Sequence, residues 1–465
     1  MDNLILMTDS YKASHFLQYP PQTTSMYSYV ESRGGTYPET VFFGLQYILE
    51  RYLSQPINMG DVVEAQEFFA AHGEPFPLDG WRRVVEHHNG YIPLKIRAVP
   101  EGSVVPNHNV LMDVESTDEK LFWMVTWLET LLMRVWYPIT VASQSYAIKK
   151  TIRNFLENTS DAPDAELLFK LHDFGARGVS SHESAALGGA AHLVNFQGSD
   201  TIEGLMLARD YYDEHMAGFS VPATEHSTMT AWGRAGEMAA YENALHVFGT
   251  NPIVSVVSDS YDIMAAIDQI WGGSLKEQVL AFNKAGGTLV IRFDSGEPID
   301  RIILEGVERL DAAFGHTLNT KGYKVLKGVR ALQGDGINQK SIYDILSTLT
   351  NNGWSASNIG TFGMGGALLQ QVNRDTQKFA YKCSSVVVAG TRRDIFKQPI
   401  TDLGKQSKKG RLDLIMHQGH YKTVEHGNSH TLLEPVYLNG AVLRRQTLSE
   451  IRENTVRIRN AAAVV

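Results

Sequence analysis

The chain has 465 residues, a length that suits two or three domains, or one large barrel with an additional domain. Hydrophobic residues make up 43% and charged residues 20% of the sequence, which excludes a disordered chain, a collagen and a coiled-coil rod. The formal net charge is -9, from 42 Lys and Arg against 51 Asp and Glu. This charge argues against a nucleic-acid partner, because duplex binding generally requires an excess of basic residues.

Cysteine content and hydropathy predict a cytoplasmic protein without a membrane span. The single cysteine, Cys383, can build neither a disulfide framework nor a zinc site with several thiolates. Residues 1–9 lack the basic start and long apolar run of a secretory signal. The most apolar stretch, Leu121–Ala142, contains Glu129 and Arg134. Because charges near the centre of a bilayer are costly, we expect a buried helix there.

The predicted elements change character along the chain. Up to about residue 165, helices are mixed with short strands such as Ile92–Val99. In the middle of the chain, short apolar runs end in a polar or glycine-containing turn, and a segment with helical apolar spacing follows, such as Ile299–Phe314 or Ile337–Leu349. The apolar runs are Leu167–Leu171, Phe219–Pro222, Ile253–Val257, Thr288–Ile291, Val329–Leu332 and Ile359–Phe362.

This alternation predicts parallel strands joined by crossover helices. Six such units favour an α/β barrel, and an open doubly wound sheet is the alternative. Further strand-like runs follow at Ser385–Ala389 and Thr431–Leu438. We therefore predict an α/β fold with a barrel catalytic domain over residues 166–374. A second, mixed α+β domain is predicted from both chain ends, residues 1–165 and 375–465.

Polar side chains follow the predicted strands, where barrel enzymes place their catalytic groups. They are Asp173, His226, Asp259, Asp294 and Asp335. Each aspartate could instead cap the helix that follows it, but together they favour a shared polar pocket. Asp259 and Asp294 suit Mg²⁺, a hard ion that bridges to phosphate oxygens, or the stabilisation of a developing cation.

Glycines and basic residues predict a site for a phosphorylated ligand. Gly363–Gly366 and Gly334–Gly336 follow two predicted strands, where backbone N–H groups can approach an anion, although tight turns without a ligand are the alternative. A basic group in the last quarter of the chain suits a pyrophosphate or nucleotide, although a solvated loop explains part of it equally well. It includes Arg374, Lys382, Lys397 and Lys405. Zinc-hydrolase, nucleophile-elbow and P-loop motifs do not occur in the sequence.

Long strings of residues resemble the nicotinamide phosphoribosyltransferases, a type II phosphoribosyltransferase family. They run in order along the chain as TDSYKASHFLQYPP from residue 8, KLHDFGARGVSS, VPATEHSTMTAWG, SVVSDSYDI, IRFDSGEP, LQGDGI and FGMGGALLQ. The resemblance implies a transferase of NAD biosynthesis. Such an enzyme would make nicotinamide mononucleotide and pyrophosphate from nicotinamide and phosphoribosyl pyrophosphate, with Mg²⁺, as a homodimer with shared sites. It also implies stimulation by ATP through a phosphohistidine at His226.

The resemblance also assigns roles to individual residues. Phe174 and Tyr11 of the partner subunit would stack on the pyridine ring, and Asp200 would accept a hydrogen bond from the carboxamide and repel nicotinate. Catalysis is assigned to His226, Asp259 and Asp294, the last two facing Mg²⁺. Further substrate contacts are assigned to Asp9, Arg177, Arg292, Gly334, Asp335, Gly365, Gly366 and Arg374. Pyrophosphate or ATP contacts are assigned to Arg33, Lys382, Lys397 and Lys405.

Three positions depart from the family pattern: Phe293, Ala367 and Ala380 stand where proline, glycine and serine are expected. Ala367 and Ala380 bear on the phosphate and ATP contacts, and none of the three removes a proposed catalytic group. The closest alternative is a nicotinate phosphoribosyltransferase, which would need a cation or neutral donor in place of Asp200. More distant alternatives are a phosphate-binding barrel lyase or isomerase and a protein that keeps the fold without catalysis.

Overall fold

A computed structural model describes residues 3–398, 400–401, 406–428 and 430–462. Its contacts divide the chain into two compact units. Unit 1 contains residues 1–143, 208–215 and 373–465, and unit 2 contains residues 144–207 and 216–372. The predicted domain limits near residues 165 and 375 stay a prediction.

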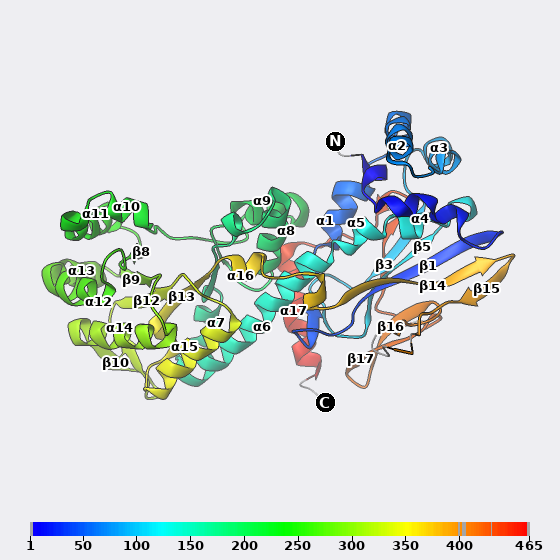
Figure 1. Ribbon diagram of the computed structural model, residues 1–465. Helices are drawn as coiled ribbons and strands as arrows, with labels where there is room; N and C mark the ends of the chain where they lie inside the picture. Colours follow the sequence, from blue (N-terminus) through cyan, green and yellow to red (C-terminus); the bar gives the residue numbers. More distant parts are fainter. Residues whose placement is uncertain (1–2, 399, 402–405, 429, 463–465) are drawn as a thin grey trace. The chain divides into compact units, whose positions relative to one another are not determined.

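Unit 1 is built on a seven-stranded antiparallel sheet with the order β15-β14-β1-β5-β3-β18-β19. Three strands come from the N-terminal part, namely β1 (Thr23–Ser32), β3 (Leu94–Ala98) and β5 (Val110–Ser116). Four come from the C-terminal part, namely β14 (Phe379–Val388), β15 (Thr391–Asp394), β18 (Glu434–Leu438) and β19 (Ala441–Val442). The N-terminal strands β1, β5 and β3 thus lie together between C-terminal strands on both sides, and Figure 1 shows blue β1 next to gold β14. The predicted α+β part from both chain ends is confirmed.

Helices and two small strand pairs complete unit 1. The strand pairs are β2 (Glu39–Val41) with β4 (Val104–Pro106) and β16 (Leu412–His417) with β17 (His420–Glu425). The longer helical segments are η2 (Ser10–Leu17), η3 (Leu49–Leu53), α2 (Met59–His72), α3 (Leu78–His87) and α17 (Leu448–Ala462). The shorter ones are η1 (Leu4–Leu6), α1 (Leu45–Ile48), η4 (Glu119–Leu121) and η9 (Arg374–Thr376).

The apolar stretch Leu121–Ala142 forms three helices rather than the single buried helix predicted. They are α4 (Met124–Trp127), α5 (Glu129–Met133) and the start of α6 (Trp136–Thr159), which runs across the unit boundary. Pro138 lies in the first turn of α6. Proline is tolerated there because it lacks only an N–H that would have no partner in the helix, but it cannot continue a preceding helix.

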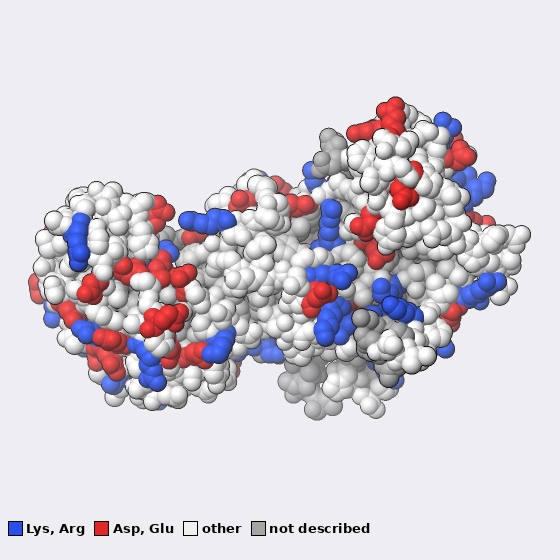
Figure 2. Space-filling view, in the orientation of Figure 1, with Lys and Arg blue, Asp and Glu red and all other residues white. Residues whose placement is uncertain are grey.

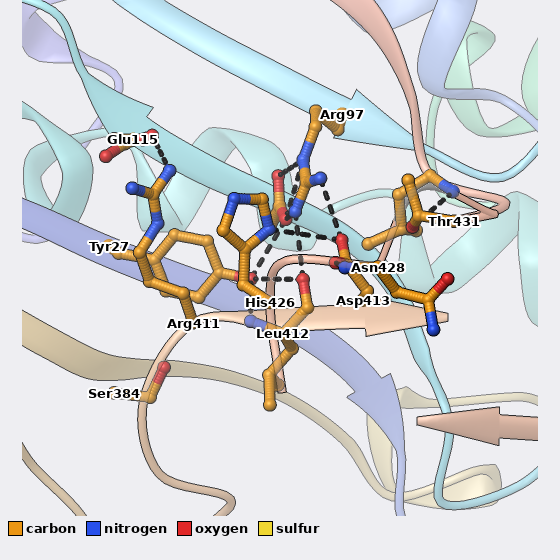
Figure 3. A network of polar contacts seen from close by, with 12 residues as sticks. Tyr27, Arg97, Glu115, Ser384, Arg411, Leu412, Asp413, His426, Asn428 and Thr431 are labelled. Carbon is orange, nitrogen blue, oxygen red and sulfur yellow. Dashed lines mark hydrogen bonds and ion pairs between the residues drawn. The ribbon is translucent and has the colours of Figure 1, made fainter. Parts of the chain in front are cut away.

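A buried polar network joins the β16–β17 hairpin to the large sheet (Figure 3). Arg97 on β3 contacts Asp113 on β5, with an Nη2–Oδ2 distance of 2.5 Å, and Asp413 on β16, with an Nη1–Oδ1 distance of 2.9 Å. The other oxygen of Asp413 accepts hydrogen bonds from the backbone N–H groups of Gly427 and Asn428. Each charge in the network is therefore paired, as buried charges require.

We expect Asp413→Ala to lower the free energy of unfolding by about 3–5 kcal/mol, because it leaves the buried Arg97 with one of its two carboxylate partners. Urea unfolding measures the change. Asp344→Ala is the matched control, since Asp344 is paired with Lys340 on the surface of the protein, and it is expected to cost less than about 1 kcal/mol. Equal losses in the two variants would contradict the stabilising role of the network.

Unit 2 contains a six-stranded parallel sheet with the order β7-β6-β13-β12-β9-β8. The strands are β6 (Leu171–Asp173), β7 (Gly198–Ser199), β8 (Ile253–Val257), β9 (Thr288–Phe293), β12 (Val329–Gln333) and β13 (Ile359–Met364). Residues 219–224 connect the two outer strands: Phe219 forms a parallel bridge with Gly198 of β7, and Ala223 forms one with Ser255 of β8.

This segment closes the sheet into a ring whose members follow chain order. From β6 the ring runs through β7, residues 219–224, β8, β9, β12 and β13, and β13 pairs again with β6. The α/β barrel prediction is therefore confirmed. Because the strands are parallel, their C-terminal ends lie at one rim, where a barrel places its functional groups.

Helices connect the strands of unit 2. The longer ones are α8 (His182–Leu193), α9 (Ile202–Tyr212), α11 (Glu237–Phe248), η7 (Ala266–Ser274), α13 (Lys276–Lys284), α14 (Ile299–Phe314) and α15 (Gln339–Asn351). The others are α7 (Pro163–Leu167), η5 (Ala176–Gly178), α10 (His226–Thr230), η6 (Arg234–Gly236), α12 (Ile263–Ala265), η8 (Ala356–Asn358) and α16 (Gly366–Leu369). A two-stranded pair, β10 (His316–Leu318) and β11 (Lys324–Leu326), follows α14.

The surface carries both signs of charge. Figure 2 shows acidic and basic side chains interspersed on the visible face. Among the described residues, no helix combines the length and the apolar character that crossing a bilayer requires.

Candidate active site

A pocket of about 900 Å³ opens at the C-terminal rim of the barrel in unit 2. Its volume lies in the range of small-molecule sites. Eleven of the predicted site residues line it: Phe174, Arg177, Asp200, His226, Asp259, Arg292, Asp294, Gly334, Asp335, Gly365 and Gly366. Arg292 lies on β9, the other residues follow the seven ring members, and the barrel brings them together.

Arg292 and Asp294 form the charged floor of the pocket after β9. Two parallel hydrogen bonds join them, from Nε to Oδ1 at 2.9 Å and from Nη2 to Oδ2 at 2.6 Å. The guanidinium also lies 5.3 Å from the centre of the Phe174 ring. Gly334 makes room for this pair, because a Cβ there would lie 2.4 Å from Asp294 Oδ1. Arg292 therefore keeps the Asp294 carboxylate and the face of the Phe174 ring close together.

Asp259 connects two sides of the pocket. Its Oδ1 lies 2.9 Å from Nε2 of His226, the first residue of α10. Its Oδ2 accepts hydrogen bonds from the backbone N–H of Asp294 at 3.2 Å and from Oγ of Ser295 at 2.6 Å. His226 itself is about half exposed to the pocket. A partly exposed imidazole oriented by a buried carboxylate can act as a nucleophile or exchange a proton.

The two carboxylates do not form a metal centre by themselves. Both oxygens of Asp259 accept hydrogen bonds, and both oxygens of Asp294 face Arg292. Over the described part of the chain, no group of three or more His, Cys, Asp or Glu side chains is arranged to hold a metal ion. A Mg²⁺ ion at this pair would therefore share oxygens that already accept hydrogen bonds, which favours contact through water or phosphate oxygens.

Asp200 lies on the side of the pocket that contains Phe174. Burial disfavours its charge, but hydrogen bonds from His172 and Ser220 and the attraction of His172 and Arg292 hold the pKa of Asp200 below its ordinary value. The carboxylate is therefore ionised at neutral pH. An ionised carboxylate only accepts hydrogen bonds, so it can bind a carboxamide N–H and disfavours a second carboxylate.

Asp173, at the end of β6, is buried rather than exposed in the pocket. Burial raises its pKa to about 6, against the opposing effect of the hydrogen bond from the Gly175 N–H. The folded state thus binds this proton more tightly than the unfolded chain, whose carboxyl has its ordinary pKa of 3.8. The stability of the protein therefore falls as pH rises from about 4 to about 6, and the loss persists above that range.

We expect Asp173→Asn to raise the free energy of unfolding at pH 7.5 by up to about 3 kcal/mol, because the amide oxygen still accepts from Gly175 without a buried charge. At pH 4, where the wild-type carboxyl binds its proton, the gain is expected to shrink to below about 1 kcal/mol. Urea unfolding at the two pH values measures the difference. A gain that does not depend on pH would contradict the assignment.

The remaining predicted residues lie in unit 1. Arg33, Arg374, Lys382 and Lys397 form a basic cluster there, and Lys405 lies outside the described residues. Burial lowers the pKa of Lys382, and repulsion by Arg33, Lys397 and Arg374 lowers it further against the attraction of Glu129. Such a cluster favours a bound anion. Asp9 accepts a hydrogen bond from Thr130, and the Tyr11 side chain is 58% exposed.

A single helical turn, α16 (Gly366–Leu369), follows the glycine-rich turn after β13. It is too short to carry a helix dipole of consequence. The space beside the turn is nevertheless unoccupied, because a Cβ at Gly366 would meet no atom within 4 Å. Gly365 and Gly366 therefore leave space at the rim of the pocket.

Comparisons with known proteins agree with this geometry. The model of the "Nicotinate phosphoribosyltransferase (NAPRTase) family" matches residues 169–440, and the model "Nicotinamide phosphoribosyltransferase, N-terminal domain" matches residues 3–96. A relative from Xanthomonas campestris pv. campestris (strain 8004), named nicotinamide phosphoribosyltransferase, is 55% identical over 97% of this chain and 98% of its own. A relative of the same name from Acinetobacter baylyi is 31% identical over 96% and 95% of the two chains.

Two solved structures share the fold at low sequence identity. The nicotinate-nucleotide pyrophosphorylase of Pyrococcus furiosus has a TM-score of 0.62 at 16% identity and covers 99% of this chain and 97% of its own. Human nicotinic acid phosphoribosyltransferase has a TM-score of 0.59 at 15% identity and covers 98% and 94%. The barrel, its pocket and these matches agree: the chain belongs to the nicotinate phosphoribosyltransferase family and contains the N-terminal domain of the nicotinamide phosphoribosyltransferases.

Proposed function

We propose that this protein is a nicotinamide phosphoribosyltransferase, which forms nicotinamide mononucleotide and pyrophosphate from nicotinamide and phosphoribosyl pyrophosphate in NAD salvage. The observation that carries the choice of substrate is the ionised Asp200 in the pocket that Phe174 lines. A carboxylate here accepts from the amide of nicotinamide and repels the carboxylate of nicotinate. The relative that is 55% identical has the corresponding name.

The pocket suits the chemistry of this transfer. The bond between the anomeric carbon and the pyrophosphate oxygen breaks, positive charge develops on the ribosyl ring, and the pyridine nitrogen forms the new bond with its own electron pair. Because this nitrogen carries no proton, the step needs no general base. It needs alignment of the two reactants and a fixed negative charge beside the developing cation. We assign that charge to Asp294 and the alignment of the pyridine ring to Phe174.

We propose Mg²⁺ as an ion that enters with the pyrophosphate group, with Asp259 and Asp294 acting on it through water or phosphate oxygens. This proposal follows from the side chains, whose oxygens already accept hydrogen bonds. When bound, the ion would neutralise charge on the leaving pyrophosphate. Mg²⁺ keeps part of its hydration shell in most phosphate sites, which agrees with indirect contacts.

We further propose a cytoplasmic homodimer in which Tyr11 of the partner subunit covers the ring face opposite Phe174. The exposure of the Tyr11 ring supports this proposal. The basic cluster of Arg33, Arg374, Lys382 and Lys397 is proposed to bind pyrophosphate or ATP. Clustered Arg and Lys side chains bind polyphosphates through charge-assisted hydrogen bonds.

The proposed function is tested by incubating the protein with phosphoribosyl pyrophosphate and Mg²⁺, and with either nicotinamide or nicotinate. Chromatography then quantifies the mononucleotide formed. Product from nicotinamide is expected, with kcat/KM at least about 100-fold above that for nicotinate, because the carboxylate of bound nicotinate would lie beside the carboxylate of Asp200. Turnover of nicotinate alone would identify a nicotinate phosphoribosyltransferase, and no product from either substrate would refute phosphoribosyl transfer.

His226→Ala is expected to abolish stimulation by ATP and to keep basal turnover within about 5-fold of wild type. The proposed reason is that Asp259 holds Nε2 of His226 at 2.9 Å, which leaves the lone pair of Nδ1 to receive the phosphoryl group. The ribosyl transfer itself needs no imidazole. Turnover with and without ATP measures the effect. His246→Ala, a substitution of an exposed histidine on α11, is the control, and stimulation that survives in His226→Ala would exclude the role.

A further inference from the structure

Two side chains hold the same oxygen of Asp200. Nε2 of His172 lies 2.9 Å from Oδ1, and Oγ of Ser220 donates to that oxygen at 2.5 Å. Asp200 lines the pocket, whereas His172 and Ser220 contact it from outside the lining. Among the described residues, Oδ2 of Asp200 has no hydrogen-bond partner. The two carboxylate oxygens therefore differ: His172 and Ser220 occupy both lone pairs of Oδ1, and Oδ2 keeps its own.

The strands on both sides of β6 are shaped around this arrangement. In the sheet, His172 pairs with Gly198 of β7 on one side and with Gly363 of β13 on the other. A Cβ at Gly198 would lie 2.9 Å from Nδ1 of His172, and a Cβ at Gly363 would lie 2.0 Å from Cε2 of Phe174. Glycine weakens a strand interior, and its presence marks a close approach of another group. Here the approaching groups are the imidazole and the phenyl ring.

The backbone of Asp200 is fixed as well. Its N–H donates to the carbonyl oxygen of Asp173 at 3.0 Å, and the side chain of His172 is only 11% exposed. An imidazole that is nearly buried against Gly198 moves little. A side chain held at its backbone and at one oxygen has few rotamers left, so the direction of the second oxygen is set before a ligand binds.

We infer that His172 is a positioning residue for substrate choice. With Ser220 it fixes Oδ1 of Asp200 and leaves Oδ2 to accept the carboxamide N–H of the ring substrate. This inference rests on the proposed function and adds to it a residue outside the pocket lining. Pre-organisation of this kind favours binding because the ligand does not have to order the side chain.

Three variants separate positioning from packing. His172→Phe keeps an aromatic ring and removes the donor. His172→Gln retains an N–H donor at a similar distance from the backbone. Gly198→Ala keeps the imidazole of His172 but displaces it, because the added Cβ would lie 2.9 Å from Nδ1. His182→Phe is the matched control, because His182 is an exposed histidine at the start of α8.

The kinetic constants for nicotinamide, nicotinate and phosphoribosyl pyrophosphate are measured for each variant. We expect His172→Phe to raise KM for nicotinamide about 10-fold or more, with kcat and KM for phosphoribosyl pyrophosphate within about 3-fold of wild type. The nicotinamide-to-nicotinate ratio of kcat/KM is expected to fall at least about 10-fold. His172→Gln should restore most of both effects, Gly198→Ala should resemble His172→Phe, and His182→Phe should resemble wild type.

Two results overturn the inference. One is an unchanged substrate ratio in His172→Phe. The other is that His172→Phe and His172→Gln impair kcat and the KM values for nicotinamide and phosphoribosyl pyrophosphate to the same extent. That result would show that the histidine has only a structural role. The wild type alone tests the proposed function: if it does not turn over nicotinamide, that function fails. The inference is then decided by calorimetric binding of nicotinamide, where equal Kd values for wild type, His172→Phe and His172→Gln refute it.

Discussion

Replacing Asp294 by alanine is expected to lower kcat/KM about 10³-fold, which corresponds to about 4 kcal/mol of lost transition-state stabilisation. The variant removes the fixed negative charge and also leaves the guanidinium of Arg292 without its bidentate partner. That guanidinium lies beside Phe174, so an uncompensated positive charge would face the developing ribosyl cation. Steady-state turnover at saturating phosphoribosyl pyrophosphate measures the loss.

Two further variants complete this experiment. Asp294→Asn keeps the shape of the side chain, and its loss is expected to be nearly as large if charge is the cause. Asp268→Ala is the control, since Asp268 forms a surface ion pair with Arg309 away from the pocket lining. Near-wild-type turnover in Asp294→Ala would exclude Asp294 from the reaction.

Replacing Asp200 by asparagine is expected to lower the nicotinamide-to-nicotinate ratio of kcat/KM about 100-fold, or about 2.7 kcal/mol. His172 and Ser220 both contact Oδ1, so they favour the asparagine rotamer that keeps its oxygen there. The amide NH₂ then replaces Oδ2 and faces the ligand as a donor. A donor binds the carboxylate of nicotinate and leaves the amide N–H of nicotinamide without an acceptor.

Competition between the two ring substrates in one reaction measures this ratio directly. Asp210→Asn is the control, because Asp210 is an exposed residue of α9 that pairs with Arg209. A ratio that stays at the wild-type value in Asp200→Asn would show that another group selects the substrate.

Short, mostly apolar runs made the barrel predictable. β8, β9, β12 and β13 are largely buried parallel strands, so apolar residues predominate in each of them. β7 has only two residues, Gly198 and Ser199, and leaves no such signal. Residues 219–222 were predicted to be a strand, but within them only Phe219 forms a bridge, and Pro222 has no N–H to donate to a neighbour.

The candidate site was predictable in part for a related reason. The aspartates at strand ends are recognisable because the end of a parallel strand is itself visible in the sequence. The roles of His172 and Ser220 depend on contacts with Asp200, which is 28 and 20 residues away along the chain, and local patterns do not report such contacts. The strand-end position of His172 and the glycines opposite it were the available signals.

The segment that closes the barrel has a consequence for how the enzyme can evolve. Residues 219–224 contain Ser220, which binds Asp200, and they also provide the bridges that join β7 to β8. The same short stretch therefore contributes to the cooperativity of folding and to the choice of ligand. A mutation there trades stability against specificity, so new substrate preferences should arise more readily on the loops after β9 and β12, whose strands keep full ladders on both sides.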